Sequence, residues 1–153
     1  MKGAISVKKN FGILPSGEEA SLYTISCGGI TAGISDYGAT LVSLLVPDSA
    51  GSLADVVLGC DDCVGYAVGG GCLGATVGRN ANRIQGASFR LNGKDYTLTP
   101  NENGNNLHSG PDLYFKRMWK LVSHTDTAVT LELNSPHGDQ GFPGNAVIRV
   151  TYS

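Results

Sequence analysis

The chain has 153 residues, of which 41% are apolar, and its 11 Lys and Arg against 13 Asp and Glu give a net charge of −2. This length and composition predict one globular domain and exclude a disordered chain. The weakly acidic balance, without a basic run, argues against nucleic acid and anionic membranes as partners, because both require a concentrated positive field. A neutral, polar small molecule is the expected ligand class.

Alternation of apolar and polar residues predicts half-buried strands along the chain. The alternating stretches are residues 22–27, 30–34, 129–134 and 148–152. Between the second and third of these, Asn92-Gly93 separates two further alternating runs. Asn-Gly supplies the positive φ angles of a tight hairpin turn, so a hairpin is expected there.

The stretch from Asp112 to Asn134 has no Gly or Pro, and some of its apolar residues also fit one face of a helix. We favour a turn followed by a strand near residues 117–123, because the neighbouring pattern is that of strands. Clusters of Gly, Pro, Asn, Asp and Ser separate the strands elsewhere, at residues 15–17, 47–51, 69–71 and 101–110. Many short strands with turns between them predict an all-β sandwich or barrel-like sheet.

The N-terminus lacks the apolar core of a signal peptide, and no apolar run reaches the roughly 18 residues of a membrane helix. A cytoplasmic location is therefore expected. The four cysteines are Cys27, Cys60, Cys63 and Cys72. Cys60 and Cys63 form a CxxC, but the second half of a zinc site is absent, and the two aspartates between them disfavour a reactive thiolate. We expect no metal and ordinary free thiols.

Two stretches combine polar side chains with glycines, residues 78–84 (GRNANRI) and 101–110 (NENGNNLHSG). Arg offers a planar fork of donors, Asn both donor and acceptor, and His108 a group that holds or moves a proton near neutral pH. Such a set suits a polyol. The residues alone leave another interpretation open: Arg79 or Arg83 as a solvated or core-pinning arginine, Asn82 as a turn residue and His108 as a loop histidine. His124 and His137 are expected to be structural.

A combination of motifs in the chain resembles the aldose 1-epimerase (galactose mutarotase) family nearly from end to end. The segments that carry the resemblance are 36–48 (DYGATLVSLLVPD), 55–59 (DVVLG), 74–79 (GATVGR), 81–84 (ANRI), 106–110 (NLHSG), Trp119 and 135–144 (SPHGDQGFPG). The resemblance implies a large, mostly antiparallel β-sandwich that interconverts the α and β anomers of an aldohexose without a cofactor. Residues 1–153 then form the N-terminal part of a single domain that is incomplete at its C-terminus.

The resemblance also implies roles for individual residues. Arg83 and His108 would act in catalysis and bind the sugar near its ring oxygen, and Asn82 would bind it as well. A general base takes the proton of the anomeric hydroxyl while a general acid protonates the ring oxygen, so the ring opens and recloses as the other anomer. In the family a second histidine and a glutamate perform these transfers, and both lie beyond this chain. Glu102 and Glu132 do not fit the base.

Two departures from the family pattern stand near the site: Ser109 replaces a glycine, and His137 replaces an acidic residue. We expect an aldose 1-epimerase as the parent protein and no significant activity from the 153-residue chain alone. The alternative is a non-catalytic β-sandwich that binds a monosaccharide without turning it over. The preferred aldose and the oligomeric state stay open.

Overall fold

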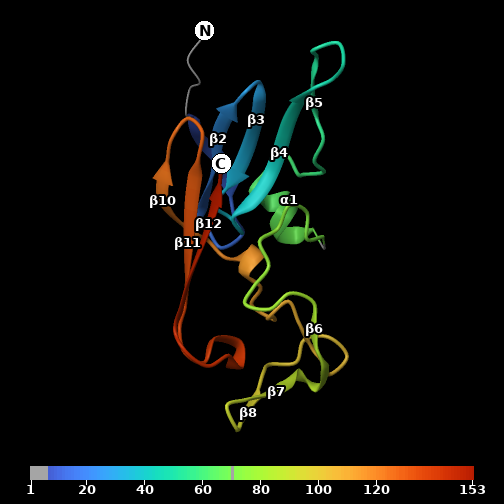
Figure 1. Cartoon of the computed structure of the whole chain (residues 1–153), viewed down its shortest axis with the longest axis vertical. Helices are drawn as coiled ribbons and strands as arrows, with labels where there is room; N and C mark the ends of the chain where they lie inside the picture. Colours follow the sequence, from blue (N-terminus) through green and yellow to red (C-terminus); the bar gives the residue numbers. More distant parts are fainter. Residues whose placement is uncertain (1–6, 70) are drawn as a thin grey trace.

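The computed structural model describes residues 7–69 and 71–153. Its largest sheet has five antiparallel strands in sequential order. They are β1 (Val7–Ile13), β2 (Glu19–Cys27), β3 (Ile30–Ser35), β4 (Thr40–Pro47) and β5 (Leu53–Asp55). A second, three-stranded antiparallel sheet contains β10 (Lys120–His124), β11 (Val129–Ser135) and β12 (Ala146–Tyr152). The two sheets lie against each other (Figure 1).

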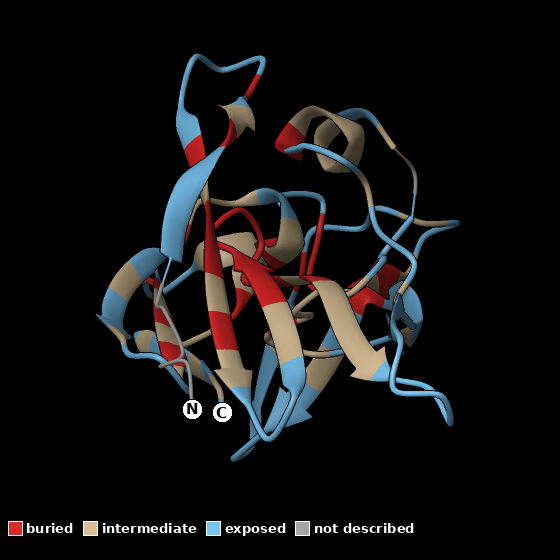
Figure 2. Cartoon of the chain, turned by 90° about the horizontal axis from the view of Figure 1, so that it is seen from above, coloured by how far each residue is buried: buried red, intermediate tan, exposed pale blue. Residues whose placement is uncertain are grey.

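The main core lies between these two sheets. Tyr23, Ile25 and Ile34 of the five-stranded sheet pack in one buried cluster with Val129 and Leu131 of β11. Buried segments gather at the middle of the molecule, with exposed loops around them (Figure 2). Alternate residues of each strand point to the same face, which explains why the odd-numbered positions 23 and 25, and 129 and 131, meet in the same layer.

The other face of the five-stranded sheet is also partly covered. Leu22 and Val42 belong to a second buried cluster, into which the short helix α1 (Cys63–Val68) places Cys63. Asp62 caps this helix by accepting a hydrogen bond from the backbone N–H of Gly65 at 2.9 Å. Strand β4 is buried on both faces, because Leu41 packs against the main cluster and Val42 belongs to the second one. Its sequence therefore does not alternate clearly, and its pattern did not predict a strand.

Part of the chain that connects the five-stranded sheet to the three-stranded sheet forms a smaller region, at the end of the molecule away from the N-terminus (Figure 1). It contains β6 (Arg83–Ile84) paired with β9 (Asn106–Leu107), and the hairpin of β7 (Ser88–Leu91) and β8 (Lys94–Thr97). The short 3-10 helices η1 (Gln85–Ala87), η2 (Tyr114–Lys116) and η3 (Asp139–Gly141) complete the connections. A small cluster of Ala87, Leu98 and Phe142 is its core.

The structure confirms the predicted all-β class and the predicted hairpin. Asn92 and Gly93 connect β7 to β8 with φ angles of +51° and +77°. The stretch after Asp112 is a turn followed by β10, as favoured, although this strand begins at Lys120. Residues 101–110, expected to be a loop, contain the two-residue strand β9, too short to show a period. Within the described ranges, no helix is long and apolar enough to cross a membrane.

Candidate functional site

The pairing of β6 with β9 brings the two polar stretches of the sequence together. Arg83 lies opposite Leu107 and Ile84 opposite Asn106 in an antiparallel register. The residues that flank this ladder, Asn82 before β6 and His108 after β9, therefore become neighbours. Tertiary pairing thus joins three of the predicted site residues, Asn82, Arg83 and His108.

Two hydrogen bonds connect Asn82 and His108. The backbone N–H of Asn82 donates to the ring Nδ1 of His108 at 3.0 Å, and the backbone N–H of His108 donates to the carbonyl of Asn82 at 2.9 Å. Because Nδ1 accepts, the neutral imidazole carries its proton on Nε2. His108 therefore presents an N–H donor from a ring whose other nitrogen is fixed.

Both residues have left-handed backbones, with φ of +60° at Asn82 and +53° at His108. Such angles are uncommon outside glycine and are held in place by the surrounding structure. The two hydrogen bonds provide that support here. They place the imidazole beside β6.

Arg83 is held by an acidic partner that the sequence did not single out for this role. Its Nε and Nη2 donate to the two carboxylate oxygens of Glu102 at 3.2 and 2.9 Å, and its Nη1 donates to Oδ1 of Asn82 at 2.9 Å. The hydrogen bonds with Arg83 hold the pKa of Glu102 below its usual value, and the same contacts raise the pKa of Arg83. Glu102 is thus a carboxylate bound to a cation, which agrees with the expectation that it is a poor general base.

Ser109 anchors the chain just after His108. Its side chain is buried, its φ is +57°, and its hydroxyl accepts from the N–H of Asn80 at 2.7 Å and donates to the carbonyl of Asn80 at 3.1 Å. The left-handed angle explains why a glycine suits this position. The serine compensates with two hydrogen bonds that tie residues 78–84 to residues 101–110.

Asn106 fixes the same loop from inside. It is fully buried, and its amide nitrogen donates to the carbonyls of Thr99 and Gly110 at 2.7 and 3.0 Å. The side chain of Asn101 forms a second bridge, accepting from Leu107 N–H at 2.6 Å and donating to its carbonyl at 2.9 Å. The asparagines of this stretch are therefore mainly scaffold.

Arg79 is a core-pinning arginine, the alternative that the sequence left open. Its guanidinium donates to the hydroxyl and carbonyl of Ser135 and to the carbonyls of Pro136 and Pro143 at 2.7–3.0 Å. It also lies over the ring of Phe142, at 5.8 Å from the centroid. Arg79 thereby fastens residues 78–84 to the end of β11.

The other two histidines make structural contacts. Nε2 of His124 is 3.0 Å from the carbonyl of Thr24, and its ring meets that of Tyr23 edge to face. Nδ1 of His137 accepts from the N–H of Gly144 at 2.9 Å and closes the loop between β11 and β12. Neither is placed with Arg83 and His108, in line with the expectation that both are structural.

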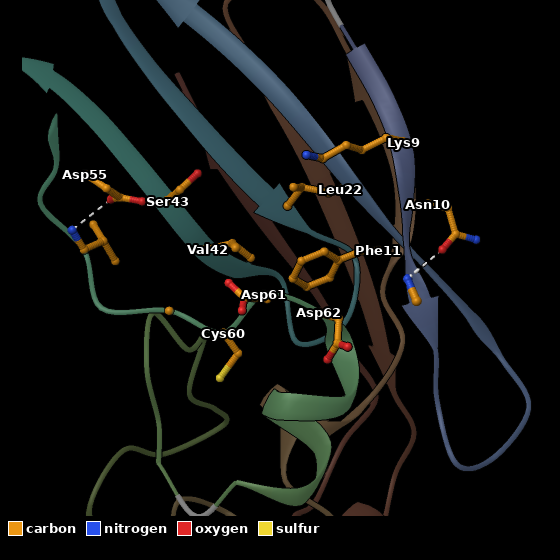
Figure 3. Close-up of a pocket in the computed structure, with 13 residues that line it drawn as sticks. Lys9, Asn10, Phe11, Leu22, Val42, Ser43, Asp55, Cys60, Asp61 and Asp62 are labelled. Atoms are coloured by element: carbon orange, nitrogen blue, oxygen red, sulfur yellow. Dashed lines mark hydrogen bonds between the residues drawn. The ribbon is translucent and has the colours of Figure 1, made fainter. Parts of the chain in front are cut away.

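A cavity of about 580 Å³ lies elsewhere, on the face of the five-stranded sheet opposite the main core (Figure 3). Phe11, Leu22 and Val42 form its apolar part, and polar side chains that include Asp55 and Cys60 surround it. It contains neither Arg83 nor His108. That these two residues share a concavity, as one small sugar requires, stays a prediction.

All four cysteines are free, and Cys63 is buried. Burial, assisted by the neighbouring carboxylate of Asp62, raises the pKa of the Cys63 thiol, which opposes thiolate chemistry. Among residues 7–69 and 71–153, no group of three or more His, Cys, Asp or Glu side chains is placed to hold a metal ion.

Comparison with known proteins supports the family resemblance that the motifs indicate. The family model described as aldose 1-epimerase matches residues 21–153. The chain belongs to this family. It is 39% identical to the aldose 1-epimerase of Escherichia coli K12 over 141 residues, which are 92% of this chain and 41% of that protein. It is 36% identical to the galactose mutarotase of Bos taurus, over 94% of this chain and 42% of that protein.

Solved structures of the family have the same fold. The crystal structure of a GalM/aldose epimerase homologue from C. elegans superposes with a TM-score of 0.82 at 38% identity, over 88% of this chain and 42% of that chain. A galactose 1-epimerase from Lactobacillus acidophilus matches with a TM-score of 0.83 at 23% identity, over 98% and 44% of the two chains. This chain thus spans about two fifths of the length of the curated relatives it matches.

Proposed function

We propose that the protein carrying these residues is an aldose 1-epimerase that interconverts the α and β anomers of a neutral aldohexose such as galactose or glucose. The observation that carries the proposal is the joining of Arg83 and His108 across the β6–β9 ladder through Asn82. In this proposal, the donors of Arg83 in β6 and of His108 just after β9 face one small ligand. Such fixed donors suit the oxygen atoms of a sugar.

The roles follow from which donors are still free. His108 offers Nε2–H, because its Nδ1 already accepts from Asn82. Arg83 has five N–H groups, of which three have partners among the described residues. In the proposed mechanism these donors bind the sugar near its ring oxygen and stabilise the charge that develops there as the ring opens.

The two proton transfers need further groups. Glu102 is bound to Arg83, and Glu132 to Arg149 at 2.7 Å, so both carboxylates are engaged by cations. We therefore propose that the general acid and base come from parts of the protein outside these 153 residues. A missing positioned acid or base typically costs about 10²–10⁴-fold in rate. The 153-residue chain is then expected to bind a sugar without catalysing measurable mutarotation.

Polarimetry on freshly dissolved α-D-galactose tests this function. The protein at the length of its relatives should accelerate the change of rotation, and the 153-residue chain at equal concentration should not. Binding of galactose without any acceleration by the longer protein would instead support a non-catalytic sugar-binding module. Equal catalysis by both would show that the proton-transfer groups lie within residues 1–153.

The expected partner and location belong to the same proposal. The substrate is a small aldose, and the weak net charge of −2 argues against nucleic acid or a membrane as partner. We propose a cytoplasmic location for the protein. Cell fractionation with an antibody against the protein tests the location.

A further inference from the structure

Glu102 fixes the side chain of Arg83 in one plane. Nε and Nη2 donate side-on to the two carboxylate oxygens at 3.2 and 2.9 Å, and Nη1 donates to Asn82 at 2.9 Å from the other end of the guanidinium. Paired contacts of this kind define the orientation of the guanidinium as well as its position. Among the residues that the structure describes, one N–H on Nη1 and one on Nη2 of Arg83 have no acceptor.

Glu102 is itself held in position by a tight turn of the backbone. Glu102 and Asn105 close a tight turn through two backbone hydrogen bonds of 3.2 and 2.8 Å, with left-handed φ angles at Asn103 and Gly104 between them. The side chain of Asn105 accepts from the N–H of Gly86 at 3.0 Å and so connects this turn to η1. The support for Arg83 therefore comes from a turn fixed at two points.

Exposure argues against a mainly stabilising role for this ion pair. The side chains of Arg83 and Glu102 are 49% and 26% exposed, so water screens their attraction. Pairs of this kind contribute little to folding stability. What the pair does change is the charge of the site, because the carboxylate balances the guanidinium beside Asn82.

We propose that Glu102 is a positioning residue that orients Arg83 toward the sugar and makes the site prefer neutral over anionic sugars. The inference rests on the proposed function. A sugar carboxylate at C6 is attached to C5, beside the ring oxygen that Arg83 is proposed to approach. With Glu102 present, such an anion meets a carboxylate as well as the guanidinium, and it gains little from Arg83.

The test compares Glu102→Gln and Glu102→Asp with the unaltered protein, at the length that catalyses mutarotation. Asp95→Asn is the matched control, because Asp95 also pairs with an arginine, Arg90, at 3.4 Å on the exposed β7–β8 hairpin. The measurements are kcat and KM for galactose, the inhibition constant of D-galacturonate, and the melting temperature. Glu102→Gln should lower kcat/KM for galactose by about tenfold, the effect of losing charged hydrogen bonds. It should tighten inhibition by galacturonate several-fold.

In Glu102→Gln the activity on galactose should fall while the affinity for galacturonate rises, and these opposite changes distinguish a positioning role from a structural one. Glu102→Asp should recover part of the galactose activity. Asp95→Asn should change neither kcat/KM for galactose nor the inhibition constant of galacturonate. A loss for galactose without a gain for galacturonate would assign Glu102 a structural role and overturn the proposal, as would unchanged kinetics in Glu102→Gln. If the unaltered protein itself lacks mutarotase activity, the proposed function fails, and this inference fails with it.

Discussion

Asn82 donates its backbone N–H to Nδ1 of His108 and accepts the backbone N–H of His108 in return, although 26 positions separate the two residues. This reciprocal contact does two things for a sugar site. It selects the imidazole form that carries a proton on Nε2, and it keeps the ring beside Asn82, the residue that precedes Arg83.

His108→Ala is expected to lower kcat/KM for galactose by about 10²-fold in the catalytically active protein, because one fixed donor near the ring oxygen is removed. His137→Ala is the matched control, since His137 also accepts a backbone N–H through Nδ1, from Gly144 at 2.9 Å. Polarimetry should show His137→Ala within about twofold of the unaltered protein. Equal losses in the two variants would contradict a role for His108 at the sugar.

Asp139→Asn is expected to destabilise the fold in a pH-dependent manner. The carboxylate accepts two hydrogen bonds from Arg117 at 2.8 and 2.9 Å, and this contact, with that from Ser135, lowers the pKa of Asp139 to about 2. Since the folded pKa lies below the ordinary value of about 3.9, the carboxylate stabilises the fold by roughly 2–3 kcal/mol at neutral pH. That contribution is complete above about pH 4–5 and is lost as the pH falls toward 2.

Urea unfolding of the unaltered protein and of Asp139→Asn at pH 7 and at pH 3 measures this effect. The difference in unfolding free energy should be large at pH 7 and smaller at pH 3. Asp95→Asn, whose exposed pair with Arg90 is screened by water, should differ little at either pH. The same loss for Asp139→Asn at both pH values would show that the lowered pKa is not the source of the stability.

Ser109 offers a test of backbone strain against hydrogen bonding. Ser109→Ala removes both hydrogen bonds to Asn80 and keeps a Cβ at a φ of +57°, so it should cost about 1–3 kcal/mol of unfolding free energy. Ser109→Gly loses the same bonds but relieves the left-handed angle, and it should be less harmful by about 1 kcal/mol. At Ser123, an exposed position of β10, the order should reverse, because glycine weakens a strand. Urea unfolding of the four variants decides the order.

Thiol alkylation followed by peptide mass spectrometry tests the assignment of the cysteines as ordinary free thiols. Cys27 and Cys72 are exposed and should react first, whereas the buried Cys63 should react only when the protein unfolds. Burial raises the pKa of Cys63 and so lowers its thiolate fraction near neutral pH. Alkylation of Cys63 in the native protein as fast as that of Cys72 would revive a redox role for the CxxC.

The sequence by itself determined the features that depend on local chemistry. Alternation predicted the strands with one buried face, such as β11, and Asn92-Gly93 predicted the hairpin. Both features depend on only a few neighbouring residues. The combination of ANRI with NLH carried the family resemblance and named Arg83, Asn82 and His108. Strand β4, buried on both faces, did not alternate and was missed.

Only the tertiary structure decided which side chains form hydrogen bonds with each other. The residues alone left both Arg79 and Arg83 open to a core-pinning role, since an arginine that pins a core and one that faces a ligand have the same local pattern, and only the family resemblance favoured Arg83 for the site. Pairing of β6 with β9 and packing against β11 separated them: Arg79 became bound to Ser135, and Arg83 to Glu102, 19 positions away. Such contacts depend on chain segments that meet only after the sheets have formed, and hydrogen-bond partners at that distance leave no periodic trace in a single sequence.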